Sequence, residues 1–293
     1  MELGYDYPLY RPPSEARSLI FQVTLGCSFN KCSFCNMYRT KDYSERPLED
    51  IHEEIELMAK YYPETKRIFL ADGDALNLRT DKLVEIITNI KRRFKNIERI
   101  SSYSMPKNLM QKSIEDLNAL KSAGLDMVYL GIESGNDKIL KKVTKGATSK
   151  MIIDSCNKAK EVNFILSCMV ILGLGGKKYT LQHATDTAHV INSIEPDYVG
   201  ALTLYMEPEI EAEFLEKFEE PFSALEDNEI LVELGNLVDN INVKNNVLFR
   251  ANHASNVYAI GGTLPHDKNQ ILSKIKYLQT HPELLKPKVL RRF

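Results

Sequence analysis

The sequence predicts an α/β fold, a partial (β/α)6 TIM-like barrel with a C-terminal extension. Short apolar runs recur along the middle of the chain, and an amphipathic helical segment follows each of them. Nearly continuous apolar runs indicate strands buried on both faces, as in a parallel sheet covered by helices. Parallel strands joined through helices imply right-handed crossovers. Because there are six such units rather than the eight of a closed barrel, we expect a sheet that stays partly open.

The elements follow in order along the chain. The expected strands are 18–25, 67–72, 99–104, 127–132, 166–172 and 198–205. The expected helices are 47–62, 81–94, 113–124, 150–162 and 180–194, with another near 227–241. Thr80 and Ser149 are the expected N-caps of their helices, and Gly124 is an expected C-cap residue. Pro196 should stop the helix before it.

Composition limits the domain organisation and the partners. The 293 residues suit one domain, with a core and N-terminal arm over 1–210 and a C-terminal extension over 211–293. Hydrophobic residues make up 43% and charged residues 27%, which is typical of soluble globular proteins. The net charge of −2 argues against general nucleic-acid binding. Neither a signal peptide nor a membrane-spanning run is visible, so we expect a cytoplasmic protein with no membrane partner.

The stretch GCSFNKCSFC holds three of the five cysteines, Cys27, Cys32 and Cys35. In a reducing compartment, clustered cysteines more often bind metal than form disulfides. A structural zinc site usually pairs two short ligand hairpins, and there is no second CxxC or nearby CxxH here. A thioredoxin-like CxxC would not need the third cysteine. Three thiolates on one loop fit a [4Fe–4S] cluster whose fourth iron lacks a protein ligand.

Phe34 precedes the last cysteine, and the whole loop follows the first expected strand. This arrangement resembles the radical S-adenosylmethionine (SAM) superfamily over residues 15–210. The resemblance implies that Cys27, Cys32 and Cys35 are the cluster ligands, with Phe34 beside the cofactor. Most members separate the first two cysteines by three residues, whereas four separate them here, and a loop bulge can absorb the extra one. The wider chain resembles compact coproporphyrinogen-oxidase-like and Elongator-like members.

Further motifs of the superfamily are similar to segments of this chain, in the same order. ADGDALNL places Asp72, Gly73 and Asp74 where the family holds the methionine amino group; otherwise, Asp-Gly is a turn that caps the next helix. YLGIESGND resembles the family's GIESG motif, which implies that Glu133 accepts hydrogen bonds from the ribose, with Ser134 beside it.

Two more positions complete the cofactor site that the resemblance implies. Lys145 stands where related enzymes often carry a cation for the methionine carboxylate; taken alone, it would be a solvated surface lysine. VILGLGGKK places Gly173 and Gly175 where backbone would approach the adenine. The same Gly-rich turn also resembles a Walker loop, but it lacks the spacing of a P-loop and the Ser/Thr that follows the lysine.

The resemblance implies a radical SAM enzyme, an oxidoreductase in which a reduced [4Fe–4S] cluster cleaves SAM to a 5′-deoxyadenosyl radical. That radical would abstract hydrogen from an unknown small-molecule or peptide substrate. An external donor such as flavodoxin or ferredoxin would supply the electron. Two alternatives remain open: a non-catalytic iron–sulfur protein, and a zinc-stabilised α/β barrel with unrelated chemistry.

Substrate contacts must come from residues outside these shared motifs. His253 lies in the polar stretch FRANHASN, which fits a loop that closes over the site or a turn that satisfies its own backbone. Because a histidine can act as acid, base or hydrogen-bond partner near neutral pH, His253 is the first catalytic candidate, with Tyr205 at the end of the sixth expected strand as the second. His183 and His189 are expected on a helix surface, and residues 5–16 as a pinned N-terminal arm.

Overall fold

The computed structural model describes residues 4–291, which divide into two compact units. Of these, residues 4–30, 37–130 and 155–166 form the first unit, and 31–36, 131–154 and 167–291 form the second. The boundary expected at residue 210 stays a prediction; residues 211–291 belong to the same unit as 167–210. Within residues 4–291, no helix is both long and apolar enough to cross a membrane.

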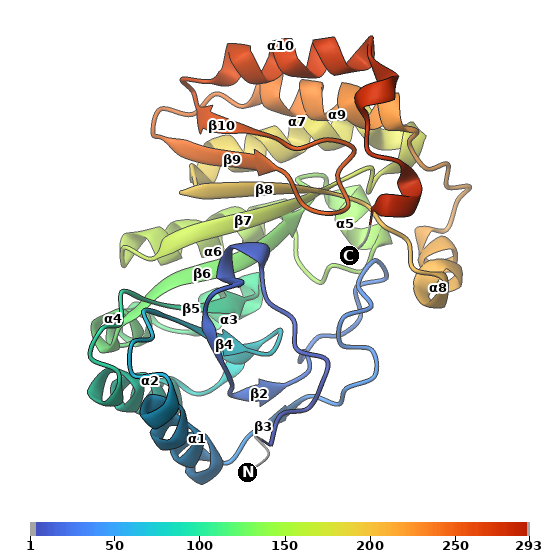
Figure 1. Ribbon diagram of the computed structural model, residues 1–293. Helices are drawn as coiled ribbons and strands as arrows, with labels where there is room; N and C mark the ends of the chain where they lie inside the picture. The colour runs from blue at the N-terminus through green and yellow to red at the C-terminus, as the bar shows by residue number, and fades with distance from the viewer. Residues whose placement is uncertain (1–3, 292–293) are drawn as a thin grey trace. The chain divides into compact units, whose positions relative to one another are not determined.

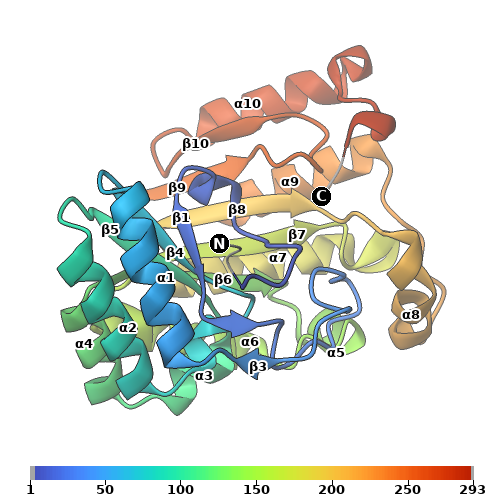
Figure 2. The same cartoon turned by 60° about the horizontal axis from the view of Figure 1, so that its bottom comes forward.

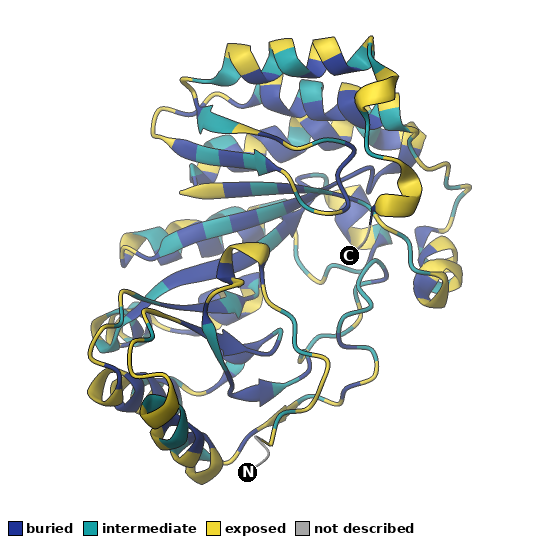
Figure 3. Cartoon of the chain, viewed as in Figure 1, coloured by how far each residue is buried: buried dark blue, intermediate teal, exposed yellow. Residues whose placement is uncertain are grey.

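The first unit contains parallel strands in the order β1, β4, β5, β6. Their bounds are β1 Leu19–Gln22, β4 Arg67–Ala71, β5 Arg99–Ser104 and β6 Leu125–Glu133, the last of which ends in the second unit. Its helices are α1 Leu48–Tyr61, α2 Thr80–Arg93, α3 Pro106–Gln111 and α4 Ile114–Ala123, with short 3-10 turns η1 Pro13–Glu15 and η2 Ala75–Asn77. Helix α2 packs between α1 and α4 (Figure 2). The strands are largely buried, and the helices expose one side (Figure 3).

The first expected strand is interrupted. The structure ends β1 at Gln22 and begins β2, Thr24–Leu25, which pairs antiparallel with β3, Ser44–Glu45. The break lies at Val23, whose N–H donates to Ala71 O at 2.7 Å while its carbonyl accepts from Arg46 N at 3.2 Å. The chain therefore leaves the parallel sheet for a small hairpin just before the cysteine loop.

The second unit contains strands in the order β7, β8, β9, β10 (Figure 1). Strands β7 Ile165–Leu172, β8 Tyr198–Thr203 and β9 Val247–Ala251 are parallel, and β10 Ile260–Leu264 is antiparallel to β9. The first two residues of β7 belong to the first unit. The helices are α5 Asp137–Lys142, α7 Gly176–Ile194, α8 Pro208–Phe218, α9 Asp227–Asn240 and α10 Lys268–Gln279, with 3-10 turns η3 Pro282–Leu284 and η4 Lys288–Leu290. Helix α9 packs on both α7 and α10. Helix α6, Ser149–Glu161, has residues in both units.

The helix ends confirm some sequence predictions and correct others. Gly124 ends α4 with a φ of 119°, and its N–H donates to Leu120 O at 3.1 Å, as expected of a C-cap glycine. Thr80 is the first residue of α2 rather than its N-cap. Ser149 likewise begins α6, and the hydroxyl of Thr148 accepts from Met151 N at 3.2 Å. Both predictions were therefore one residue late.

The N-terminal arm is pinned to the first unit, as the sequence suggested. Tyr5 donates from its hydroxyl to Ile20 O at 2.7 Å, and Asp6 N donates to Gln22 Oε1 at 2.9 Å. Farther along, Glu15 is fully buried, and its Oε1 accepts from Arg99 at 2.7 Å and from Tyr129 at 2.6 Å. This carboxylate ties the arm to β5 and β6.

Candidate functional site

The cysteine loop runs from one unit into the other. Cys27 belongs to the first unit, and Cys32 and Cys35 belong to the second. All three are partly exposed thiols, and Cys35 N donates to Cys32 O at 3.1 Å, which closes a tight turn. Among residues 4–291, no three Cys, His, Asp or Glu side chains gather at the spacing of a formed metal site. The donor set is nevertheless of the right chemistry, because thiolates are the ligands that iron–sulfur clusters take.

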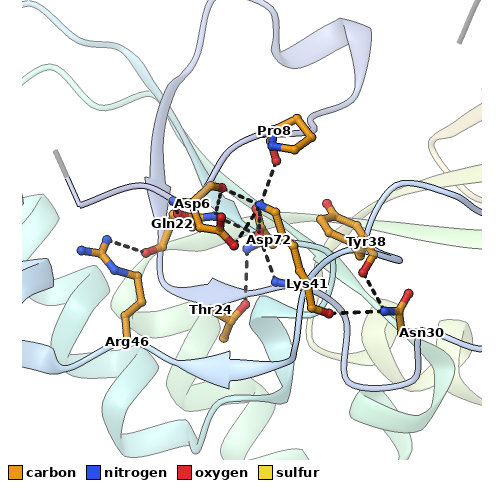
Figure 4. A network of polar contacts seen from close by, with 10 residues as sticks. Asp6, Pro8, Gln22, Thr24, Asn30, Tyr38, Lys41, Arg46 and Asp72 are labelled. Atoms are coloured by element: carbon orange, nitrogen blue, oxygen red, sulfur yellow. Dashed lines mark hydrogen bonds and ion pairs between the residues drawn. The ribbon is translucent and has the colours of Figure 1, made fainter. Parts of the chain in front are cut away.

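Asp72 immediately follows β4 and is completely buried. Its Oδ2 accepts three hydrogen bonds: from Gln22 Nε2 at 2.8 Å, from Gly26 N at 3.0 Å and from Lys41 Nζ at 3.1 Å (Figure 4). Burial raises the pKa of Asp72, and these donors oppose the rise. The carboxylate thus fixes the residue before Cys27 to the end of β4. Sequence reasoning missed Gln22 and Lys41, since neither stands in a recognisable motif.

Gly73 and Asp74 continue the same turn in the first unit. A Cβ on Gly73 would lie 2.3 Å from Tyr38 Cε2, so only glycine lets the ring approach this closely. Asp74 is also fully buried and accepts from the hydroxyl of Ser28, while burial raises its pKa to about 6. Oδ1 of Asp72 and Oδ1 of Asp74 lack a hydrogen-bond partner within the described part of the chain. Two buried acceptor oxygens of this kind suit an ammonium group.

Glu133 and Lys145 form an ion pair in the second unit, with 2.9 Å between Oε1 and Nζ. Both side chains are 12% exposed. Burial acts to lower the pKa of Lys145, but Glu133 and the thiolates of Cys32 and Cys35 outweigh it, and the pKa is raised. A Cβ on Gly131 would lie 1.8 Å from Glu133 Oε1 and 2.8 Å from Lys145 Nζ. Glycine at 131 therefore provides the room in which the pair forms.

The backbone at Glu133 is unusual for a residue with a side chain. Its φ is 62°, in the left-handed region, and Ser134 N donates to Ile132 O at 2.8 Å in a tight turn. Non-glycine residues in this region are strained by about 1–3 kcal/mol, and such residues cluster at functional sites. The turn carries the Glu133 carboxylate past the end of β6.

Phe34 fixes the cysteine loop to the second unit. Its ring packs against a buried cluster of Ile139, Val143, Ile171, Leu174, Tyr179, Phe214 and Phe218. Ser33 N donates to Val143 O at 3.0 Å, and Lys145 Nζ lies 6.0 Å from the centre of the Phe34 ring. The loop that carries Cys32 and Cys35 is thereby held beside the Glu133–Lys145 pair.

His183 is buried, so its expected surface position is wrong, whereas His189 is exposed as expected. Nδ1 of His183 lies 2.8 Å from Ser134 Oγ, and its Nε2 lies 3.0 Å from Ile171 O. A carbonyl can only accept, so Nε2 carries the proton, and Nδ1 accepts from the Ser134 hydroxyl. His183 therefore positions the turn that contains Glu133.

Gly173 and Gly175 meet side chains of their own unit. Gly173 has a φ of 81°, and its N–H donates to Glu233 Oε1 at 2.6 Å. A Cβ on Gly175 would lie 2.8 Å from Ile139 Cδ1 and 3.0 Å from Tyr179 Cβ. Packing alone thus requires these glycines, and their contact with adenine stays a prediction. Glu233, which is fully buried, was missed because its α9 segment shows only helical periodicity.

The two catalytic candidates lie beyond the carboxyl ends of β8 and β9. His253 is partly buried, its Nδ1 is 3.0 Å from Ser255 Oγ, and burial together with Lys286 lowers its pKa. Ser255 Oγ accepts from Thr203 N at 3.1 Å, which ties the loop to the end of β8. Tyr205 is 37% exposed. The loop after β9 therefore stands at the edge where parallel α/β sheets bind ligands.

These features define a class of protein: an α/β chain with a thiolate loop after its first strand and buried carboxylates at the ends of later strands. The family model of the Radical SAM superfamily matches residues 21–191. The chain belongs to the Radical SAM superfamily.

Curated relatives agree with this membership. The chain is 27% identical over 185 residues to the heme chaperone HemW of Bacillus subtilis (strain 168), covering 62% of this chain and 47% of that one. It is 32% identical over 152 residues to a probable GTP 3′,8-cyclase of Methanocaldococcus jannaschii, covering 51% and 47%. The chain thus spans about half the length of the curated relatives it matches.

Solved structures show the same fold. Coproporphyrinogen III oxidase (HemN) from Escherichia coli matches with a TM-score of 0.57 and 16% identity, over 76% of this chain and 53% of that one. Methylornithine synthase (PylB) matches with a TM-score of 0.54 and 16% identity, over 77% and 63%. The predicted α/β partial barrel and the coproporphyrinogen-oxidase-like relatives are confirmed. Radical SAM proteins use a [4Fe–4S] cluster and SAM, and this chain takes both cofactors.

Proposed function

We propose that this chain is an enzyme that uses SAM for radical chemistry on a substrate. When bound, the cluster and SAM supply one-electron cleavage of a C–S bond and a 5′-deoxyadenosyl radical that abstracts hydrogen. A flavodoxin or ferredoxin would supply the electron. The chain's own residues bind and orient these groups and keep water away from them.

One observation carries the proposal: the Glu133–Lys145 ion pair at 2.9 Å, on a strained turn beside the loop of Cys32 and Cys35. A surface ion pair needs neither a left-handed backbone nor a glycine neighbour, and both are present here. Glu133 keeps Oε2 for the ribose hydroxyls of SAM, because Oε1 accepts from Lys145. Lys145 has further ammonium protons for the methionine carboxylate.

The remaining roles follow from the donors and acceptors present. Cys27, Cys32 and Cys35 would ligate the cluster through their thiolates. The orphan Oδ1 atoms of Asp72 and Asp74 would accept from the methionine ammonium. Backbone near Gly173 and Gly175 would approach the adenine, with Phe34 and Ser134 supporting the site. His253 and Tyr205 would contact the substrate.

Anaerobic reconstitution tests the proposal. We expect about four irons and four sulfides per chain, and 5′-deoxyadenosine when a strong reductant and SAM are added. Cys32→Ala should lose both the iron and the product. Cys156→Ala is the matched control, since Cys156 is buried in α6 and outside the loop. Zinc without sulfide in the wild-type chain would instead support a zinc-stabilised barrel.

A second candidate is a non-catalytic iron–sulfur protein. The likeness to the heme chaperone HemW of Bacillus subtilis favours it, because that relative is named a chaperone rather than an enzyme. Both candidates predict a brown, cluster-containing protein. They differ in turnover: the second predicts no 5′-deoxyadenosine from the reduced protein.

A further inference from the structure

A row of four residues crosses the sheet of the second unit. Met169 of β7 is in register with Gly200 of β8, Gly200 with Arg250 of β9, and Arg250 with Gly261 of β10. The neighbours of this row along the strands point to the other face, because side chains alternate along a strand. A Cβ on Gly262 would lie 3.1 Å from Ile271 of α10, so that other face is the helix-covered one. The row therefore lies on the face away from α10, which is the inner face of a β/α barrel.

Arg250 lies across Gly261. A Cβ on Gly261 would be 2.9 Å from Arg250 Cδ and 3.0 Å from Nη1, so the arginine occupies the space that a side chain would take. Nη1 donates to Phe249 O at 3.0 Å and reaches Gly262 O at 3.5 Å. One nitrogen of the guanidinium is thus held by backbone carbonyls, and the group has a fixed position.

The other side of the guanidinium has no protein partner. Nε and Nη2 make no hydrogen bond or ion pair with any residue in the described range 4–291. Three other arginines of the described range 4–291 that are partly or fully buried form ion pairs: Arg46 with Glu54, Arg99 with Glu15 and Arg291 with Asp227. Arg250 is partly buried and has no carboxylate partner of this kind within that range, so its Nε and Nη2 are available to a ligand.

Gly200 leaves space on the same face of the sheet as Arg250. A Cβ on Gly200, its neighbour on β8, would meet nothing nearer than Met169 Cγ at 3.9 Å. The carboxyl edge above it carries a buried acceptor: Asn256 is 4% exposed, and its Oδ1 has no partner in the described part of the chain. Asn256 Nδ2 lies 3.3 Å from Thr203 Oγ1, which holds the amide at the end of β8.

We propose that Arg250 binds a carboxylate of the substrate, and that the substrate is a small molecule carrying this group. Nε and Nη2 form the side of a guanidinium that pairs with a carboxylate through two parallel hydrogen bonds. We expect a carboxylate rather than a phosphate, because Arg250 alone supplies a single positive charge. The site adds a substrate class to the proposed function, and the assignment of the bound molecule as the substrate rests on that function.

Anion titrations test the site without any turnover. The probes are succinate and acetate, with inorganic phosphate and neutral succinamide at matched ionic strength, and the readout is the thermal midpoint of the reconstituted full chain. We expect saturable stabilisation by the carboxylates and none by succinamide. Arg250→Gln should weaken the apparent affinity about tenfold or more, and Arg250→Lys should fall between, because an ammonium cannot form the paired contact.

Gly200→Val keeps the charge and fills the space beside it, so it too should lose the response. This variant guards against misreading a folding defect in the arginine variants. Tighter binding of phosphate than of succinate, or an unchanged response in Arg250→Gln, would overturn the proposal, as would no saturable response in the wild-type chain. Carboxylate binding without SAM cleavage would count against the proposed function alone. Cleavage without carboxylate binding would count against this site alone.

Discussion

The carboxylate of Glu233, on α9, accepts a 2.6 Å hydrogen bond from the backbone N–H of Gly173. Its other oxygen accepts from Thr180 Oγ1, also at 2.6 Å, and the side chain is completely buried. Helix α9 therefore holds the turn after β7, where the adenine contact is proposed.

Replacing Glu233 should destabilise the protein in a graded way. Glu233→Ala leaves the Gly173 N–H without an acceptor, and we expect the free energy of unfolding to fall by about 2–4 kcal/mol. Glu233→Gln should cost less, because its amide can still accept from Gly173 and donate to Thr180. Urea unfolding measures both, with Val232→Ala, 43% exposed on the same helix, as the control. Equal stability of the alanine variant and the control would contradict this role.

Gly131→Ala should separate SAM binding from cluster binding. The new Cβ would collide with Glu133 Oε1 at 1.8 Å, so the carboxylate must leave Lys145. We expect SAM affinity to fall about tenfold or more while iron content is kept, measured by equilibrium dialysis and iron assay. Gly235→Ala is the control, since its Cβ would meet Ile275 Cγ2 at an ordinary 3.6 Å. Unchanged SAM affinity in Gly131→Ala would exclude Glu133 from the cofactor site.

Asp74 should make stability depend on pH. Burial raises its pKa from 3.8 to about 6, so the folded chain binds more protons there than the unfolded chain does. The contribution of this group to stability is therefore lost as pH rises from about 4 to about 6, by up to about 3 kcal/mol.

Asp74→Asn removes this titration. The difference in unfolding free energy, variant minus wild type, should increase from pH 4 to pH 7, and denaturant titrations at a series of pH values measure it. Other titrating groups cancel in the difference. A difference that stays flat over this range would mean that Asp74 titrates normally.

Tyr129→Phe tests the anchor of the N-terminal arm. The variant removes one donor to Glu15 Oε1, now at 2.6 Å, while Arg99 and Ser101 still donate to it. We expect a loss of about 1–2 kcal/mol in unfolding free energy. Tyr61→Phe, 66% exposed on α1, should change nothing measurable. A Tyr129→Phe variant as stable as Tyr61→Phe would show that this hydrogen bond contributes little.

Apolar runs predicted the parallel strands well, because burial on both faces leaves a continuous hydrophobic signal. The strand expected at 166–172 is β7, which begins one residue earlier at Ile165 and ends at Leu172. Strands β9 and β10 were not predicted as a pair. Arg250 interrupts the apolar run of β9, and two glycines lower the strand propensity of β10. Tertiary pairing rather than local propensity therefore forms these strands.

The sequence predicted where the candidate site residues lie along the strands, but it did not predict which distant residues contact them. Asp72 and Glu133 stand at strand ends, as the motifs suggested. Lys41 contacts Asp72 from 31 residues away in sequence, and Glu233 contacts Gly173, in the turn after β7, from 60 residues away. No local pattern predicts such pairing. His183 was misjudged because one polar residue on the buried side of a helix looks like a surface residue until its partner, Ser134, is known.

The most direct test is the yield of 5′-deoxyadenosine and methionine from SAM when the reconstituted, reduced chain is incubated without air. We predict both products in equal amounts from the wild-type chain, and neither from Cys32→Ala. A wild-type chain that carries its full cluster, binds SAM and still forms neither product would contradict the proposed activity.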